Sequence, residues 1–354
     1  MDEFTILTET QISFPRNFEQ EINIYSNSTI SITSPTLEVP KSTSLTNSTS
    51  KTCKYKSYSF PLPSGGLTNK KIFLLKTPKT GGSTFAGILR GIADNYNLNV
   101  INPEKDVPLF KKVSEIEKYA REINLTANQI DILCNHMEYN TEVIEQILGP
   151  EYFKVALFRE PISRTLSGYY HSRIFKVFCS EFSPEDWPYL CSDFHVGLGS
   201  WFKDRAQKGF IFRQSVQNFD HIIVSDLYTE SLLVFMHKMN LKVTDLLYIS
   251  SKSFKIPDEV LLTPEQIEKF TDVFKRKHAL DFKMYHKIRN QLLNEYESLP
   301  EHFSLLRQIF EDMLKEVQRT CTKSSEDLTD CYWSDNGCAK TCIKNWIKEN
   351  VNCE

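Results

Sequence analysis

The feature that most constrains the fold of this chain is a glycine-containing loop between an apolar run and an amphipathic segment. Residues 71–76 form the apolar run, and Phe85, Ile88, Leu89 and Ile92 after the loop are spaced as one face of a helix. A strand, a glycine loop and a helix in this order open a βαβ unit. The sequence therefore predicts an α/β fold with a parallel sheet.

Three further apolar runs predict the other strands of that sheet, at residues 129–134, 153–158 and 221–225. Beyond the last strand and the helix that follows it, only helices are expected. One begins at residue 263, with threonine as N-cap and proline at N1, and continues to about residue 297. Another spans residues 300–317. Strands that alternate with helices favour a sheet covered by helices on both faces, here with a helical C-terminal part.

The N-terminal residues differ in composition from the rest of the chain. Between residues 27 and 50, 13 of 24 residues are Ser or Thr, and such a segment buries too little apolar surface to offset its chain entropy. We therefore expect a disordered, Ser/Thr-rich stem over residues 1–66 and a folded domain over 67–320. Residues 321–354 are expected to form a cysteine-rich extension of that domain.

The cysteines indicate disulfide bonds. Five of the nine lie in the last 34 residues. They show no repeated C-x2-C spacing, so disulfides are favoured over metal ligation, and disulfides indicate an oxidising compartment. The odd number leaves at least one thiol, for which Cys134 on a predicted core strand is the candidate. Glycosylation sequons at Asn27, Asn47 and Asn124 indicate the same kind of compartment.

No segment of the sequence explains how the chain would reach such a compartment. Residues 1–20 are acidic and lack an apolar core, and no run approaches the ~18 apolar residues of a membrane helix. Either an anchoring segment precedes Met1 or the cysteines mislead. We expect the first, that is, an incomplete or alternative N-terminus.

The overall charge argues against nucleic acid as a partner. The chain has 42 Lys and Arg against 45 Asp and Glu, a formal charge of −3, whereas nucleic-acid-binding domains are usually strongly basic. This balance still allows a local basic pocket for a small anion.

The glycine loop has the residues of such an anion site. A helix N-terminus offers backbone N–H groups and the positive end of the helix dipole, and lysine and hydroxyl side chains add further donors. The Walker A pattern is absent because the lysine precedes the glycines, which argues against an ATP-using kinase. A plain strand-to-helix turn is the alternative. The predicted phosphate loop comprises Lys79, Thr80, Gly81, Gly82, Ser83 and Thr84.

A second set of anion ligands follows the strand at 153–158. Arg159 stands at the end of that strand and Ser167 lies eight residues later. An arginine fork with a serine hydroxyl suits a phosphate. Two anion sites on successive βα turns suggest a ligand with phosphates at both ends, such as 3′-phosphoadenosine 5′-phosphosulfate. The nearby basic residues Arg164, Arg173 and Lys176 either favour an anionic ligand or form a solvated helix face.

At these residues the chain resembles the galactose-3-O-sulfotransferase (galactosylceramide sulfotransferase) family, over roughly residues 70–342. The two phosphate motifs are shared by many sulfotransferases, and the later segments make the resemblance specific. The similar segments are residues 73–84 (FLLKTPKTGGST), 132–137 (ILCNHM), 158–161 (FREP) with Ser167, 220–248, 279–282 (ALDF) and 331–342.

The resemblance implies a P-loop-like sulfotransferase fold and site residues. Residues 79–84 would bind the 5′-phosphosulfate of 3′-phosphoadenosine 5′-phosphosulfate, with Lys79 stabilising the leaving phosphate, and no metal would be needed. Arg159 and Ser167 would bind the 3′-phosphate. His136 would be the catalytic base, because it follows a core strand at the sheet edge where ligands bind, and Glu138 is the second candidate.

The resemblance also implies an acceptor and a location. The acceptor would be the 3-hydroxyl of galactose on a glycolipid or glycoprotein. The protein would reside in the Golgi lumen, tethered to the membrane. Pro78 and the pair Gly81-Gly82 depart from the glycolipid enzymes and are similar to uronyl 2-O-sulfotransferases, so a uronyl acceptor is an alternative. A catalytically inactive glycan-binding relative is another.

Overall fold

The computed structural model describes residues 54–55, 67, 71–101, 110, 112–137, 139–176, 180–184, 186–187, 217–250, 256–322 and 337–352. All of them belong to the compact unit formed by residues 51–354. Apart from Lys54 and Tyr55, the predicted stem lies outside the described residues.

Within the described part of the chain, the strands form one five-stranded sheet in the order β2-β3-β1-β4-β5, and every neighbouring pair is parallel. This confirms the predicted α/β class. The strands are β1 (Ile72–Leu75), β2 (Val100–Ile101), β3 (Ile132–Asn135), β4 (Phe153–Phe158) and β5 (His221–Val224). The expected strand at 129–134 begins later, because Ala127–Gln129 form a short 3-10 helix. The two-residue edge strand β2 was not predicted.

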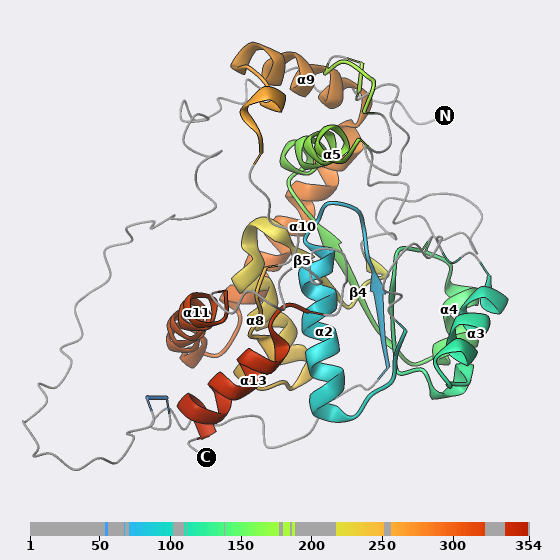
Figure 1. Cartoon of the computed structure of the whole chain (residues 1–354), viewed down its shortest axis with the longest axis vertical. Coiled ribbons are helices and arrows are strands. Elements are labelled where there is room, and N and C mark those ends of the chain that lie inside the picture. The colour runs from blue at the N-terminus through green and yellow to red at the C-terminus, as the bar shows by residue number, and fades with distance from the viewer. Residues whose placement is uncertain are drawn as a thin grey trace, which may run out of the picture. The chain divides into compact units, whose positions relative to one another are not determined.

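Helices cover both faces of the sheet, as the strand-helix alternation predicts (Figure 1). Side chains of β1 alternate between two cores. Ile72 and Leu74 pack with the helices on one face, and Phe73 and Leu75 pack on the other. The first face carries α2 (Gly82–Tyr96), α8 (Tyr228–Met239), α11 (His302–Cys321) and α13 (Lys340–Ile347). The second carries α3 (Val113–Glu122), α4 (Thr141–Leu148) and α10 (Ala279–Glu297).

The long helix expected from residue 263 is two helices. α9 (Pro264–Lys277) begins as predicted, because the Thr263 side chain accepts a hydrogen bond from the Gln266 N–H and Gln266 Oε1 accepts one from the Thr263 N–H. It ends at His278, whose φ of −122° and ψ of 37° are not helical, and α10 starts at the next residue. The hydrophobic periodicity continues across this break, so the sequence pattern does not reveal it.

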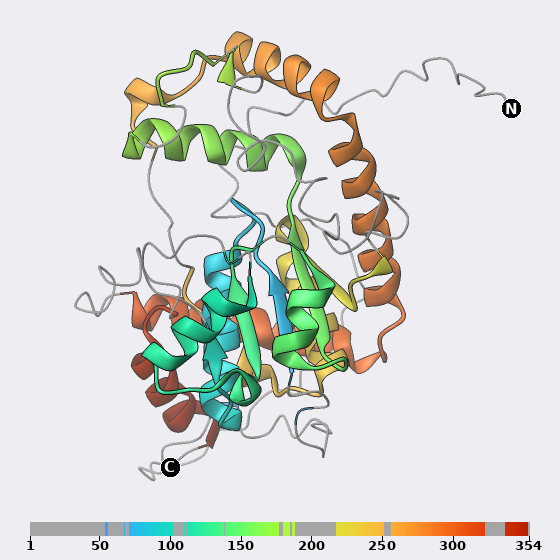
Figure 2. The ribbon, with the colours of Figure 1, turned by 90° about the vertical axis from the view of Figure 1, so that its right-hand side faces the viewer.

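A third cluster of apolar side chains joins α9 to α5 (Pro161–Phe175) beyond the end of β4 (Figure 2). Tyr169 of α5 lies edge-on to Phe270 of α9, with ring centroids 5.9 Å apart, and Trp187 stacks on the same phenylalanine at 6.1 Å. The start of α5, where Arg159 leads into the helix, is therefore held between the sheet and a separate apolar core.

The C-terminal extension is linked by disulfides and docks on the first face. Cys321 at the end of α11 bonds to Cys342 in α13, and Cys338 is also disulfide-bonded. Cys134 keeps its thiol and is fully buried in β3. These observations agree with the expected disulfide-linked tail and with the expected place of the odd thiol. None of the helices that the structure describes is long and apolar enough to cross a bilayer.

Candidate active site

The predicted phosphate loop lies at the carboxyl end of β1, in the middle of the sheet. Its backbone is unusual at two positions. Lys79 has a φ of 60° and Gly81 a φ of 78°, and the left-handed region is rarely adopted by residues with a side chain. Gly81 is the N-cap of α2, which begins at Gly82. Strained backbone of this kind gathers at ligand-binding turns.

Three side chains that follow neighbouring strands hold this loop through its carbonyl oxygens. His136 Nδ1 lies 2.7 Å from the Lys76 carbonyl, Arg159 Nη1 donates to the Lys79 carbonyl at 3.4 Å, and Ser225 Oγ donates to the Thr80 carbonyl at 2.6 Å. They follow β3, β4 and β5, whose carboxyl ends meet at one edge of the parallel sheet. With its carbonyls turned to the protein, the loop presents N–H groups at the start of α2, where Gly81 supplies no side-chain cap.

Two buried threonines attach the loop to β4 through hydrogen bonds to backbone carbonyls. Thr77 Oγ1 donates to the Leu157 carbonyl at 2.6 Å, and Thr80 Oγ1 donates to the Thr77 carbonyl at 2.9 Å. Both side chains are buried. The hydroxyl of Thr80, predicted among the ligands, therefore supports the loop from within, whereas Lys79, Ser83 and Thr84 are partly exposed.

The hydrogen bond of His136 determines which of its ring nitrogens can act as a base. A carbonyl oxygen only accepts hydrogen bonds, so the Nδ1 facing Lys76 carries the proton. In the neutral ring the lone pair is then on Nε2. His136 is partly exposed at the end of β3, as a residue that meets a substrate must be. Glu138, the second predicted base, lies outside the described residues.

The structure brings one member of the predicted 3′-phosphate pair to the loop. Arg159 contacts Lys79, so the two predicted anion-binding elements, which lie 80 residues apart in the sequence, meet in the structure. Ser167 lies partly exposed in α5, and in the described part of the chain no hydrogen bond joins it to Arg159. The N-terminus of α5 is capped by Glu160, whose carboxylate accepts from the Ile162 and Ser163 N–H groups. These two N–H groups are therefore already paired within the protein, and the predicted ligands that remain here are side chains.

Ser225 is a residue of the candidate site that sequence reasoning missed. Its hydroxyl also lies 3.1 Å from the Phe158 carbonyl, so it joins the ends of β4 and β5 to the loop. It was the last residue of the predicted strand 221–225. Because Ser225 lies at the carboxyl end of a predicted strand, the sequence could have identified it by the same reasoning that identified His136 and Arg159.

The three basic residues that follow Arg159 differ in their exposure to solvent. Arg164 is 0% exposed, so a solvated helix face is wrong for this residue, whereas Arg173 is half-buried and Lys176 is exposed. Only the packing of α5 against neighbouring helices decides this difference.

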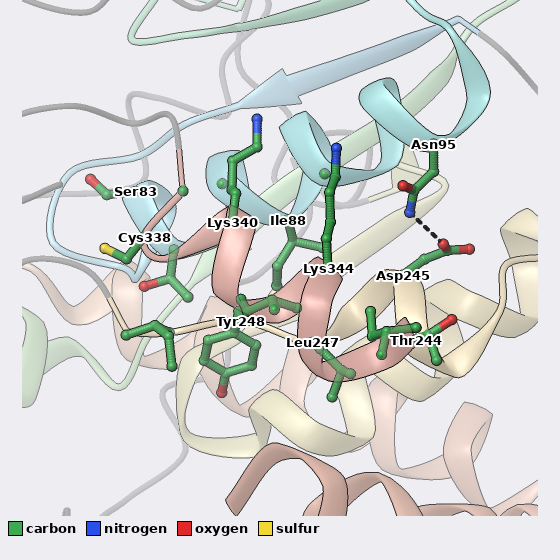
Figure 3. A pocket seen from close by; sticks show the side chains of 17 residues that line it. Ser83, Ile88, Asn95, Thr244, Asp245, Leu247, Tyr248, Cys338, Lys340 and Lys344 are labelled. Carbon is green, nitrogen blue, oxygen red and sulfur yellow. Dashed lines mark hydrogen bonds between the residues drawn. The ribbon is translucent and has the colours of Figure 1, made fainter. Parts of the chain in front are cut away.

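A pocket runs along α2 from the phosphate loop, and α13 forms one wall (Figure 3). Ser83 and Thr84 lie at its loop end, and Ile88, Leu247 and Tyr248 give it an apolar lining. Across the far end Asn95 donates to Asp245 at 2.9 Å. Lys340 and Lys344 of α13 pair with Asp94 at 2.7 and 3.5 Å. The cysteine-rich tail therefore lines a pocket that reaches Ser83 and Thr84 of the phosphate loop, which the sequence did not reveal. Within the described residues, no group of His, Cys, Asp and Glu side chains could hold a metal ion.

Comparison with known proteins finds similarity to the same family that the sequence motifs resemble. A family model described as galactose-3-O-sulfotransferase matches residues 22–183. Galactose-3-O-sulfotransferase 2 of Mus musculus is 22% identical over 241 residues, which cover 60% of this chain and 59% of that protein. Over residues 22–183, which are just under half of the chain, the protein is similar to the galactose-3-O-sulfotransferase family. Galactose-3-O-sulfotransferase 2 of Sus scrofa is 23% identical over 60% of this chain and 58% of its own length. Galactose-3-O-sulfotransferase 4 of Homo sapiens is 26% identical over 29% of this chain and 22% of its own length.

The match to this galactose-3-O-sulfotransferase family model contains most of the candidate site. The phosphate loop, His136, Arg159 and Ser167 fall within residues 22–183, whereas Ser225 and the disulfide-linked tail lie beyond it. The chain spans about three fifths of the length of the first curated relatives that it matches. No solved structure matches the chain.

Proposed function

We propose that the protein is a carbohydrate sulfotransferase that moves the sulfuryl group of 3′-phosphoadenosine 5′-phosphosulfate to a sugar hydroxyl. The observation that carries this proposal is the hydrogen bond between His136 Nδ1 and the Lys76 carbonyl. It orients the imidazole beside the phosphate loop, so that Nε2 of the neutral ring would be the proton acceptor. A structural turn alone would not need a base fixed in this tautomer.

The donor would bind across the carboxyl edge of the sheet. The N–H groups at the start of α2, with Lys79, Ser83 and Thr84, suit the 5′-phosphosulfate. Arg159 and Ser167 suit the 3′-phosphate. The contact between Arg159 and the Lys79 carbonyl supports one ligand that bridges both places.

In the proposed reaction the sugar hydroxyl attacks the sulfur in line with the leaving phosphate. His136 Nε2 takes the hydroxyl proton while the new O–S bond forms. The bond between sulfur and the phosphate oxygen breaks, and 3′-phosphoadenosine 5′-phosphate leaves with the charge of that oxygen. Lys79 and the loop N–H groups stabilise this developing charge, because preorganised donors act strongly where water is excluded.

The proposed acceptor is the 3-hydroxyl of galactose, because the relatives named above are galactose-3-O-sulfotransferases. A galactose-terminated glycolipid or glycoprotein would then be the partner. The tail disulfide supports an oxidising compartment, which fits a Golgi lumen enzyme with a membrane tether. A uronyl 2-O acceptor and an inactive glycan-binding relative are outcomes of the test below.

The test is transfer of radiolabelled sulfate from the donor to galactose-terminated and uronate-containing glycans. We expect label on galactose, loss of turnover in Lys79→Ala and His136→Ala, and mainly weaker donor binding in Arg159→Ala. His237→Ala, an exposed histidine at the last turn of α8, is the matched control and should stay active. Label on uronate alone would reassign the acceptor, and no label on any glycan would overturn the enzyme proposal. Calorimetric binding of ATP in place of 3′-phosphoadenosine 5′-phosphate would favour a kinase.

A further inference from the structure

Arg164 is a buried cation whose side chain makes no hydrogen bond to the part of the chain that the structure describes. It lies in the first turn of α5, five residues after Arg159 and three before Ser167. The residue is 0% exposed, and within the described chain none of its three guanidinium nitrogens makes a hydrogen bond. Burying a charge without hydrogen bonds is strongly unfavourable. An aliphatic side chain would fill the same space more favourably, so packing alone does not explain an arginine here.

Two charged groups act on the Arg164 guanidinium. Asp281, near the start of α10 and only 3% exposed, favours its charge, whereas Arg159 opposes it. Burial is the largest influence and lowers the pKa of Arg164 to about 10, so the side chain still carries its charge at neutral pH. The two elements are in contact, since α5 packs against α10.

Two positive charges, those of Arg159 and Arg164, follow the end of β4 and act on each other. Arg159 contacts the phosphate loop, and Arg164, five residues further along the chain, is buried from solvent. Charge interactions are weakly screened in such a region and act over longer distances than at the surface. The repulsion between the two guanidinium groups is relieved when an anion binds at Arg159.

We propose that Arg164 is a positioning residue that strengthens the binding of the donor's 3′-phosphate at Arg159 through its buried positive charge, without touching the ligand. This inference rests on the proposed function. Asp281 compensates part of the Arg164 charge and thereby limits how strongly this charge attracts the 3′-phosphate. The chemical group recognised is a phosphate dianion on the ribose, and the 5′ end of the donor is bound independently by the loop.

The experiment compares two probes that differ only in this group. 3′-Phosphoadenosine 5′-phosphate carries the 3′-phosphate and adenosine 5′-monophosphate lacks it, so the ratio of their affinities measures what the 3′-phosphate contributes. Arg164→Met should weaken binding of the first probe about tenfold and leave the second nearly unchanged. Arg164→Lys should restore most of the ratio. Arg173→Met removes the same charge from the same helix, about 13 Å further along, and should leave the ratio unchanged.

Asp281→Asn separates an electrostatic role from a structural one. Removing the carboxylate leaves the Arg164 charge less compensated, so the variant should bind 3′-phosphoadenosine 5′-phosphate more tightly, even though its thermal stability falls. Arg164→Met and Asp281→Asn are thus expected to change the ratio in opposite directions. Weaker binding of both probes in both variants would overturn the inference, as would an unchanged ratio in Arg164→Met. Wild-type protein that binds neither probe would instead refute the proposed function.

Discussion

Two glycines one turn apart on α2 lead to a sharp prediction about the tail. A methyl group on Gly87 would lie 2.7 Å from Gly337 Cα and 3.1 Å from Gly337 N, whereas one on Gly91 would meet nothing within 4 Å. Gly337 is backbone with a φ of +86° and cannot turn aside as a flexible side chain would. Close approach of α2 to the residues before α13 therefore requires glycine at position 87 but not at position 91.

The magnitudes follow from this geometry. Replacing a helical glycine by alanine stabilises a helix by about 1 kcal/mol. Gly91→Ala should therefore raise the free energy of unfolding by about 1 kcal/mol. Gly87→Ala gains the same amount but must move the tail backbone by about 1 Å to reach an ordinary carbon–carbon contact, and such overpacking costs about 1–3 kcal/mol. Because the propensity gain is common to both variants, their difference of about 1–3 kcal/mol measures the steric effect alone.

The assay is urea unfolding of both variants under non-reducing conditions, with the free energy of unfolding compared at equal pH and salt. Gly87→Ala should be the less stable variant, and its affinity for 3′-phosphoadenosine 5′-phosphate should fall, because α2 begins at the phosphate loop. Equal stability of the two variants would refute the docking of the tail on α2.

Other parts of the structure lead to further predictions. His136→Ala should lower kcat about 10²–10⁴-fold, as expected for loss of a general base, which is a much larger effect than the several-fold weaker donor binding expected from loss of its hydrogen bond to the Lys76 carbonyl; an active variant would contradict the assignment. Ser225→Ala removes a hydrogen bond worth about 1 kcal/mol from the phosphate loop and should weaken donor binding several-fold by calorimetry. Replacing both Cys321 and Cys342 by alanine should lower the free energy of unfolding by about 2–4 kcal/mol. Burial holds the pKa of His221 well below its usual value, so the folded state stays neutral there while the unfolded chain takes up a proton below about pH 6.5. Stability should therefore fall on acidification below that pH, and His221→Gln should show a smaller loss between pH 6.5 and 5 in urea unfolding.

The sequence by itself determined the features that depend on residues close together in the chain. The apolar runs and the glycine loop predicted β1, α2 and a parallel sheet, and Thr263 predicted the start of α9. His136 and Arg159 were identified because each follows a predicted strand, and the carboxyl ends of parallel strands share one edge. These are local patterns, and backbone sterics, capping and hydrophobic periodicity act within a few residues.

Only the tertiary structure decided how those residues act. The partner of His136 Nδ1 is a carbonyl 60 residues away, and the partner of Ser225 is a carbonyl 145 residues away. Neither hydrogen bond has a local signature, because each exists only after the strands align. The burial of Arg164 and the docking of the tail at Gly87 depend likewise on packing between distant elements. Chain neighbours determine which elements form, whereas charge, tautomer and access at the site depend on what the fold places around them.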